Sequence, residues 1–252
     1  MSRADRRQRR GHRRADRLPR LRGLPGVRGR IAPRRGSLST LRAIAFDLNG
    51  TLSHDEELYF EIFAELFERE GRPVTRREYF QELVGNADPA LVRRWLGDDF
   101  ARIDELLAER IERFLHLAAD GRTVPAHTRD AVRKAAETLP VAVVSGAFRV
   151  EVDGILRGAG LATLLATVVA LEDVTRPKPD PEAYLVAAGR LGVEPCRMLA
   201  FEDTAVGIAA AKTAGLRCIA VLGSQPAGLL AEADEVVERL DAALIERLVA
   251  RS

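Results

Sequence analysis

The spacing of apolar residues changes twice along the chain. A short apolar run, Ala43 to Phe46, ends at Asp47 before an Asn-Gly turn, which is the pattern of a buried strand that closes on a carboxylate. From about 54 to 122, apolar residues recur at helical spacing only. From Val124 onward, short apolar runs alternate with helical stretches, which is typical of a parallel sheet with helical crossovers. We therefore expect an α/β fold interrupted by a helical insertion.

The insertion shows four helical patterns. The first and fourth have apolar stripes, formed by Tyr59, Phe63, Leu66 and Phe67 and by Phe100, Ile103, Leu107, Ile111, Phe114 and Leu115. Thr75 to Glu78 reads as a capping box for the second helix, and Asp88-Pro89 as the N-cap and first residue of the third. About 70 helical residues are too many for one crossover, so we expect an inserted cap with a core of its own.

Polar residues follow the strands expected after the insertion. The runs and the polar groups that follow them are Val141 to Val144 before Ser145-Gly146, Thr167 to Leu171 before Glu172, Asp173 and Lys178, and Met198 to Phe201 before Glu202-Asp203. Asp180-Pro181 begins a helix, Thr204 caps another that runs to Gly215, and Cys218 to Leu222 forms a fifth strand.

Parallel strands bring their carboxyl ends to one edge of a sheet, which is where ligands bind in open α/β folds. Asp47, Ser145, Lys178 and the pair Glu202-Asp203 should therefore meet there. Taken singly, each is more typical of a solvated loop. Their shared position at strand ends favours a single site, in which Asp47 is a candidate nucleophile or metal ligand.

Composition places the chain among ordinary globular proteins. Its 252 residues are 46% hydrophobic and 30% charged, enough for one core or a core and a small second domain. We find no apolar run long enough for a membrane span and no signal peptide, so we expect a cytoplasmic protein with no membrane partner. Cys196 and Cys218 have no motif spacing and are expected to be buried or bystander thiols.

Residues 1–40 differ from the rest in charge. They hold 14 Arg against Asp5 and Asp16, which leaves 25 basic and 35 acidic residues elsewhere. With no aromatic residue and no periodicity, this Arg-rich tail is expected to be disordered. One interpretation is a basic arm that binds nucleic acid without sequence preference; the interpretation we favour is a solvated tail.

Four motifs give the chain a resemblance to a known family. They are Phe46-Asp-Leu-Asn-Gly-Thr-Leu52, Val144-Ser-Gly146, Pro177-Lys-Pro-Asp-Pro181, and Phe201-Glu-Asp-Thr-Ala-Val-Gly-Ile-Ala-Ala-Ala-Lys-Thr-Ala-Gly215. Over about residues 42 to 240 the chain resembles the haloacid dehalogenase superfamily, in the capped branch that includes β-phosphoglucomutase and many phosphatases. The resemblance implies a Rossmann-like core over 41–53 and 123–252, with helices on both faces of the sheet and a helical cap over 54–122.

The resemblance also implies roles for particular residues. Asp47 would attack phosphorus to form an aspartyl-phosphate, with Lys178 among the catalytic residues. Asp47, the backbone carbonyl of Asn49 and Asp203 would hold Mg²⁺, with Glu202 beside them. The expected phosphate-binding residues are Thr51, Ser145, Gly146 and Lys178. Cations in such a site offset the repulsion between a phosphoryl group and the attacking carboxylate, and Mg²⁺ prefers oxygen ligands.

Asn49 departs from the family pattern. Phosphatases and mutases of the family have there a second Asp that protonates the leaving alcohol, and an amide cannot do this. One hypothesis is a hydrolase whose leaving group needs little protonation, or in which His54, Asp55 or Glu56 donates the proton. Hinge or helix-start roles are favoured for these three residues. A second is a weakly active or inactive phosphate-binding protein, and a third is different chemistry, with a phosphomutase the least favoured.

The sequence disfavours two chemistries known in the family. Phosphonate-cleaving relatives use a cap lysine, but the lysines here are Lys134, Lys178 and Lys212, all outside 54–122. Dehalogenating relatives have an aromatic residue in place of Asn49 and need no Mg²⁺, whereas Glu202-Asp203 favours a metal. We therefore expect a Mg²⁺-dependent phosphatase for a small phosphorylated metabolite. Tyr59, Arg93, Arg94 and Trp95 are candidates to select it, with core or surface roles favoured for Trp95 and the arginines.

Overall fold

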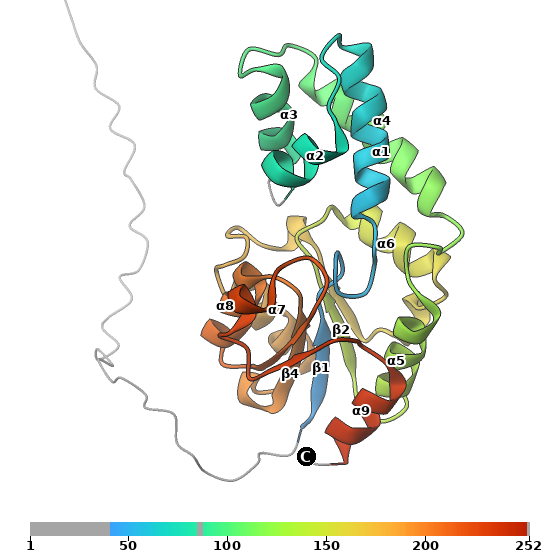
Figure 1. The fold of residues 1–252 in the computed structure, drawn as a ribbon. Helices are drawn as coiled ribbons and strands as arrows, with labels where there is room; N and C mark the ends of the chain where they lie inside the picture. The colour runs from blue at the N-terminus through green and yellow to red at the C-terminus, as the bar shows by residue number, and fades with distance from the viewer. Residues whose placement is uncertain (1–40, 85–87, 251–252) are drawn as a thin grey trace, which may run out of the picture. The chain divides into compact units, whose positions relative to one another are not determined.

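The computed structural model describes residues 41–84 and 88–250, so the prediction of a disordered tail over 1–40 lies outside it. The described residues form a six-stranded sheet in the order β3-β2-β1-β4-β5-β6, and all neighbouring strands are parallel (Figure 1). The order reverses beside β1, which is the usual binding point of an open α/β sheet. The predicted Rossmann-like fold is confirmed.

The strands agree with the sequence except at one edge and in their bounds. They are β1 (Ala43–Phe46), β2 (Val141–Val144), β3 (Thr167–Val169), β4 (Met198–Glu202), β5 (Arg217–Val221) and β6 (Glu235–Val237). β3 is two residues shorter than expected, because Leu171–Asp173 turns into a 3₁₀-helix. β6 was not predicted: it is a three-residue edge strand that begins with a charged residue, so it lacks an apolar run.

Helices cover both faces of the sheet, as expected (Figure 1). Along β1, Ala43 and Ala45 face one core and Ile44 and Phe46 face the other, which follows from the two-residue period of a strand. The alanine side packs under α7 (Glu182–Leu191) and α8 (Ala205–Ala214). The other side packs under α5 (Ala126–Ala136), α6 (Arg149–Gly158) and α9 (Ala242–Val249).

The segment between β1 and α5 is helical, as predicted. It contains α1 (Glu56–Arg69), α2 (Arg76–Glu78) continued by a π-helix (Tyr79–Leu83), α3 (Asp88–Leu96) and α4 (Ile103–Ala118), and we call residues 56–118 the helical segment. The capping box of Thr75 and Glu78 is present. α3 begins at Asp88 itself, one residue earlier than the N-cap assignment implied. No helix in the described part of the chain is long and apolar enough to cross a membrane.

The helical segment does not have a core separate from the sheet. Phe63, Phe67 and Trp95 are buried in it, and Phe67 stacks on Trp95 at 6.3 Å between ring centroids. These side chains belong to one continuous apolar cluster with Phe46 and Leu48 of the sheet side. The stripes therefore form core, as expected, and Trp95 is a core residue as favoured, but this core continues into that of the sheet. The division into a core over 41–53 and 123–252 and a cap over 54–122 stays a prediction.

Close backbone packing joins α4 to α6. A methyl group added to Gly158 of α6 would lie 2.7 Å from the carbonyl oxygen of Ala119 and 3.0 Å from that of Ala118, at the end of α4. Backbone atoms cannot yield as a flexible side chain can. One turn earlier, the corresponding methyl at Gly154 would lie 2.6 Å from the side chain of Leu115. The two helices can cross this closely only because these positions lack side chains.

We predict that Gly158→Ala destabilises the fold by about 1–3 kcal/mol, because overpacking outweighs the gain in helix propensity. The matched control is Gly189→Ala in α7, where a methyl would have no heavy atom within 4 Å. It should stabilise the protein by up to about 1 kcal/mol. Urea denaturation of both variants measures the difference, and equal effects at the two positions would contradict the close crossing.

Candidate active site

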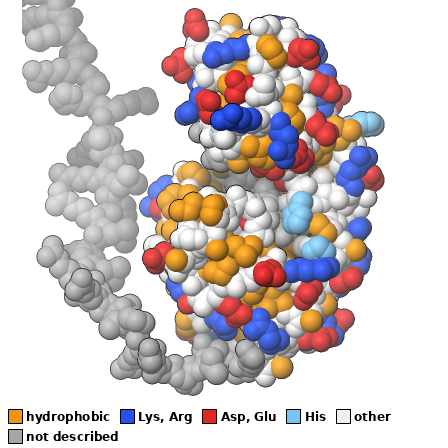
Figure 2. Space-filling model, in the orientation of Figure 1, with side chains coloured by type: hydrophobic (Ala, Val, Ile, Leu, Met, Phe, Trp, Pro, Cys, Tyr) orange, Lys and Arg blue, Asp and Glu red, His pale blue; other side chains and the backbone are white. Residues whose placement is uncertain are grey.

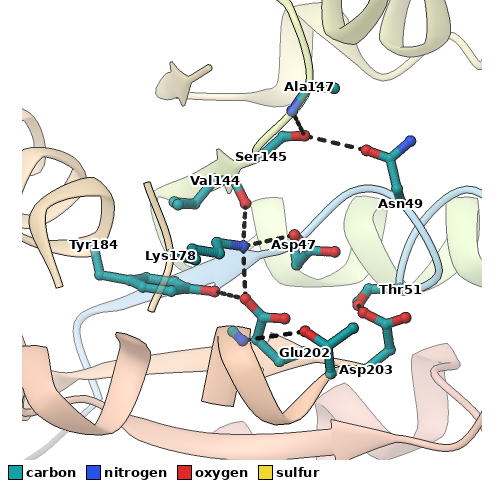
Figure 3. A network of polar contacts seen from close by, with 12 residues as sticks. Asp47, Asn49, Thr51, Val144, Ser145, Ala147, Lys178, Tyr184, Glu202 and Asp203 are labelled. Atoms are coloured by element: carbon teal, nitrogen blue, oxygen red, sulfur yellow. Dashed lines mark hydrogen bonds and ion pairs between the residues drawn. The ribbon is translucent and has the colours of Figure 1, made fainter. Parts of the chain in front are cut away.

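Four segments bring polar side chains to the carboxyl edge of the sheet, around the end of β1 (Figure 3). Asp47 follows β1, Ser145 follows β2 and Glu202 ends β4, and β2 and β4 are the two neighbours of β1. Lys178 reaches the same place from the loop between β3 and α7. The parallel topology thus gathers the residues that the sequence analysis singled out.

Lys178 lies at the centre of the contacts. Its Nζ donates to Asp47 Oδ1 at 2.6 Å, to Glu202 Oε1 at 2.6 Å and to the Val144 carbonyl at 3.0 Å (Figure 3). Burial by itself would lower the pKa of the ammonium, but the two carboxylates outweigh it and raise the pKa above its ordinary value. Lys178 is therefore a fixed positive charge against Asp47.

Three buried carboxyl groups converge beside this ammonium. Oxygens of Asp47, Glu202 and Asp203 lie within 4.8 Å of one another. Burial raises the pKa of Glu202 and of Asp203, and the neighbouring Asp47 raises that of Asp203 further. Lys178 opposes the rise in both groups. Three carboxyls with one ammonium have an excess of negative charge, and oxygen donors so grouped suit a divalent cation. The residues present therefore fit a metal site.

The turn after β1 fits against this cluster because it contains Gly50. Its φ of +84° lies in the left-handed region, and a methyl there would come within 1.9 Å of Asp203 Oδ2. Thr51, one residue on, donates from Oγ1 to Asp203 Oδ1 at 3.2 Å. The predicted phosphate-binding residue Thr51 is thus tied to the acidic cluster, whereas Gly146 lies at an open, exposed bend beyond β2.

The carboxamide of Asn49 is held on both sides. Its Oδ1 accepts a hydrogen bond from Ser145 Oγ at 3.3 Å, and its Nδ2 donates to Asp55 Oδ2 at 2.8 Å. Ser145 Oγ in turn accepts from the backbone N–H of Ala147 at 3.0 Å. These contacts fix the direction of the amide, with its oxygen toward β2 and its nitrogen toward the helical segment.

Of the three residues that the sequence analysis considered as proton donors, Asp55 is the one in contact with Asn49. It lies at the N-cap position of α1 but makes no side-chain capping bond, so its carboxyl is available to Asn49. Only 1% of Asp55 is exposed, and this burial is the main reason that its pKa rises to about 7. Asp55 therefore lies at the start of a helix, as favoured, but its side chain contacts Asn49 instead of capping the helix.

Tyr184 of α7 is a site residue that the sequence did not indicate. Its hydroxyl donates to Glu202 Oε1 at 2.5 Å, on the same oxygen that Lys178 contacts. Burial raises the pKa of Tyr184 well above its ordinary value, so the hydroxyl keeps its proton and remains a donor. In the sequence, Tyr184 is indistinguishable from any aromatic residue on the buried face of a helix.

Known proteins resemble this chain in sequence and in fold. Residues 41–215 match the family described as haloacid dehalogenase-like hydrolase. The chain is 32% identical to validoxylamine A 7'-phosphate phosphatase of Streptomyces hygroscopicus subsp. limoneus, over 77% of this chain and 92% of that protein. It is 30% identical to the protein CbbY of Rhodobacter capsulatus, over 71% and 84% of the two chains.

Solved structures also resemble this chain in fold. The crystal structure of CbbY from Rhodobacter sphaeroides in complex with phosphate is 29% identical, with a TM-score of 0.71 over 80% of this chain and 95% of that one. The family model covers more than half of the chain, and the phosphatase of Streptomyces hygroscopicus is aligned over most of its own length. The chain therefore belongs to the haloacid dehalogenase-like hydrolase family.

Proposed function

We propose that the protein is a Mg²⁺-dependent phosphatase that hydrolyses a small phosphomonoester through an aspartyl-phosphate on Asp47. The observation that carries the proposal is the contact of Asp47 with the Lys178 ammonium, beside the buried carboxyls of Glu202 and Asp203. A carboxylate so placed is paired with an ammonium and faces a site where positive charge can offset the repulsion of a phosphate. The relatives named as phosphatases support the same activity.

The proposed reaction has two steps. An oxygen of Asp47 forms a bond to phosphorus while the bond between phosphorus and the ester oxygen breaks, and the leaving alkoxide takes up a proton. Water then attacks phosphorus, the bond to Asp47 breaks, and inorganic phosphate leaves with the carboxylate restored. Lys178 offsets the charge that gathers on the phosphoryl oxygens in both steps.

Asp47, Asp203 and the backbone carbonyl of Asn49 would hold the metal, with Glu202 beside them. These are oxygen donors, and Mg²⁺ is the cation that such a set favours. Bound there, Mg²⁺ would neutralise charge on the phosphoryl group and help to orient it. Ser145, Thr51 and the backbone N–H of Gly146 are the groups that would donate to the remaining phosphoryl oxygens.

We further propose that Asp55 supplies the proton that Asn49 cannot. The carboxyl of Asp55 is hydrogen-bonded to the side chain of Asn49. Asn49 occupies the position at which the family has its acidic residue. It is buried, which keeps water from competing for the proton. Neither His54, which is exposed, nor Glu56, which accepts a hydrogen bond from Tyr79, has a contact with Asn49 among those described.

One observation favours a second candidate function. The carboxamide of Asn49 is already bonded to both Ser145 and Asp55, which suits a rigid site that binds a phosphorylated ligand and turns it over weakly or not at all. A phosphomutase is less favoured, because it needs proton transfer in both half-reactions.

The names of the relatives indicate the class of substrate. They include phosphatases of validoxylamine A 7'-phosphate and of phosphoglycolate, and a CbbY variant was crystallised with xylulose-1,5-bisphosphate. These compounds share a phosphate on a small polar metabolite. We propose a small phosphorylated metabolite as the substrate of this chain.

We predict that Asp47→Asn lowers the Mg²⁺-dependent hydrolysis of p-nitrophenyl phosphate and acetyl phosphate by at least about 10³-fold, because the nucleophile is lost. Steady-state phosphate release measures it. Asp104→Asn, an exposed change on α4, is the matched control and should keep full activity. Unchanged turnover in Asp47→Asn would remove the proposed mechanism.

The role of Asp55 predicts a dependence on the leaving group. Asp55→Asn should slow hydrolysis of alkyl phosphates by about 10²-fold and of acetyl phosphate much less, because acetate leaves without a proton. Adding Asn49→Asp to Asp55→Asn should restore alkyl phosphate hydrolysis. If Asp55→Asn slows both kinds of substrate equally, Asp55 has only a structural role.

The raised pKa values of the carboxyl pair predict how Mg²⁺ binding depends on pH. Burial raises the pKa of Glu202 and of Asp203 when the metal is absent, so each takes up a proton at a higher pH than an exposed carboxyl does. Mg²⁺ must displace these protons, and its affinity should therefore increase from about pH 6 to about pH 8. Titration calorimetry in two buffers of different ionisation enthalpy should detect the released protons.

Glu202 and Asp203 also determine how the stability of the metal-free protein changes with pH. With the metal removed by EDTA, a pKa raised above the unfolded value stabilises the folded state at low pH, and this contribution is lost as the pH rises through about 7 to 8. Saturating Mg²⁺ should cancel the loss. A Mg²⁺ affinity independent of pH over this range would contradict the assignment of the pair to the metal.

A further inference from the structure

Buried polar groups extend from Asn49 into the helical segment. Asp55 contacts Asn49, Tyr79 Oη donates to Glu56 Oε1 at 3.2 Å, and Tyr59 Oη donates to Glu151 Oε1 at 3.3 Å. We call the following residues the polar cluster: Asp55, Glu56, Tyr59, Tyr79, Asp88, Arg110 and Glu151. They come from the residue before α1, from α1 itself and from the π-helix, α3, α4 and α6, so that distant parts of the chain meet here.

Arg110 is the cation of the polar cluster, and it is already engaged. It lies on α4, where the sequence predicted an apolar stripe, and only 3% of its side chain is exposed. Its guanidinium forms ion pairs with Glu151 and with Asp88 and lies over the Tyr59 ring, 5.1 Å from the centroid. An arginine with two carboxylate partners has little capacity left for a further anion.

The polar cluster therefore has an excess of acid. It contains the carboxyl groups of Asp55, Glu56, Asp88 and Glu151 and the single guanidinium of Arg110. Even with Asp55 protonated, as its proposed role as a proton donor requires, three carboxyl groups share one guanidinium.

The leaving group of the substrate should point toward this cluster. In phosphoryl transfer the attacking and leaving oxygens lie roughly in line with phosphorus. Asp47 attacks from the end of β1, so the leaving oxygen lies on the side away from the sheet, where the helical segment stands (Figure 1). A hollow between the helical segment and the sheet-bearing part of the chain opens to the surface (Figure 2).

We infer that the substrate is the phosphate ester of an amino alcohol, whose leaving group carries a cationic amine and no second anion. The inference rests on the proposed phosphatase function. An ammonium group would lie among carboxyls that have too few cations, whereas a second phosphate or a carboxylate would meet net negative charge. Hydroxyl groups on the same molecule can bond to the free oxygens of the carboxyls and to Tyr59 and Tyr79.

Three substrates of similar size test the inference. They are 2-aminoethyl phosphate, 2-hydroxyethyl phosphate and phosphoglycolate, whose distal groups are cationic, neutral and anionic. With the full chain and Mg²⁺, kcat/KM should fall in that order, by at least about tenfold from the first to the last. A preference for phosphoglycolate would overturn the inference and leave the phosphatase function standing.

Substitutions in the polar cluster test whether it sets the preference for 2-aminoethyl phosphate. Glu151→Gln and Asp88→Asn should each reduce the ratio of kcat/KM between 2-aminoethyl phosphate and phosphoglycolate several-fold, because each removes a negative charge and frees one side of Arg110. Glu112→Gln, an exposed change on α4, should leave the ratio unchanged. Asp88→Asn serves if Glu151→Gln fails to fold, since the Asp88 side chain is 20% exposed. An unchanged ratio in a folded Asp88→Asn would contradict the role of the cluster.

Binding separates this inference from the proposed function. If none of the three esters is cleaved, nor p-nitrophenyl phosphate, the phosphatase function fails. The order of binding of the three esters to Asp47→Asn with Mg²⁺, measured by calorimetry, then decides the inference. Tightest binding of 2-aminoethyl phosphate supports it, and tightest binding of phosphoglycolate or equal binding of all three overturns it.

Discussion

The ammonium of Lys178, between the carboxylates of Asp47 and Glu202, is the contact around which the site is arranged. Both carboxylates are buried, and each would be costly to keep charged without a partner. Lys178 stabilises them, and Tyr184 adds a hydrogen bond to the same oxygen of Glu202. Because β1 lies between β2 and β4, the sheet itself holds Asp47 next to Glu202 and next to the Val144 carbonyl that also accepts from Lys178.

Asn49 departs from the family pattern, but it does not disturb this arrangement. Its backbone can serve a metal as any residue would, and its side chain is held by Ser145 and Asp55. An amide can donate and accept at once, which is why it can join two polar groups. An acidic group, Asp55, lies within one hydrogen bond of position 49, at the residue just before the helical segment.

The helical segment has two connected roles. Its apolar side chains are continuous with one face of the sheet, and α4 crosses α6 closely at Gly154 and Gly158, so it is packed against the sheet-bearing part of the chain. The ion pair between Arg110 and Glu151 spans the same helix pair. The contacts that hold the segment in place therefore include the charged groups that, in our proposal, face the leaving group.

The sequence by itself determined the parallel sheet, the helical insertion and the residues at the strand ends, because these follow from local periodicity and from motifs of adjacent residues. It missed β6, whose short, charged run has no period to detect, and it gave no sign of Tyr184 or of the buried Arg110. Only the tertiary structure decided those positions and showed that Asp55, among its neighbours, contacts Asn49. The physical reason is that burial and pairing of a polar side chain depend on partners far along the chain, such as Glu151 for Arg110, and no local pattern encodes that distance.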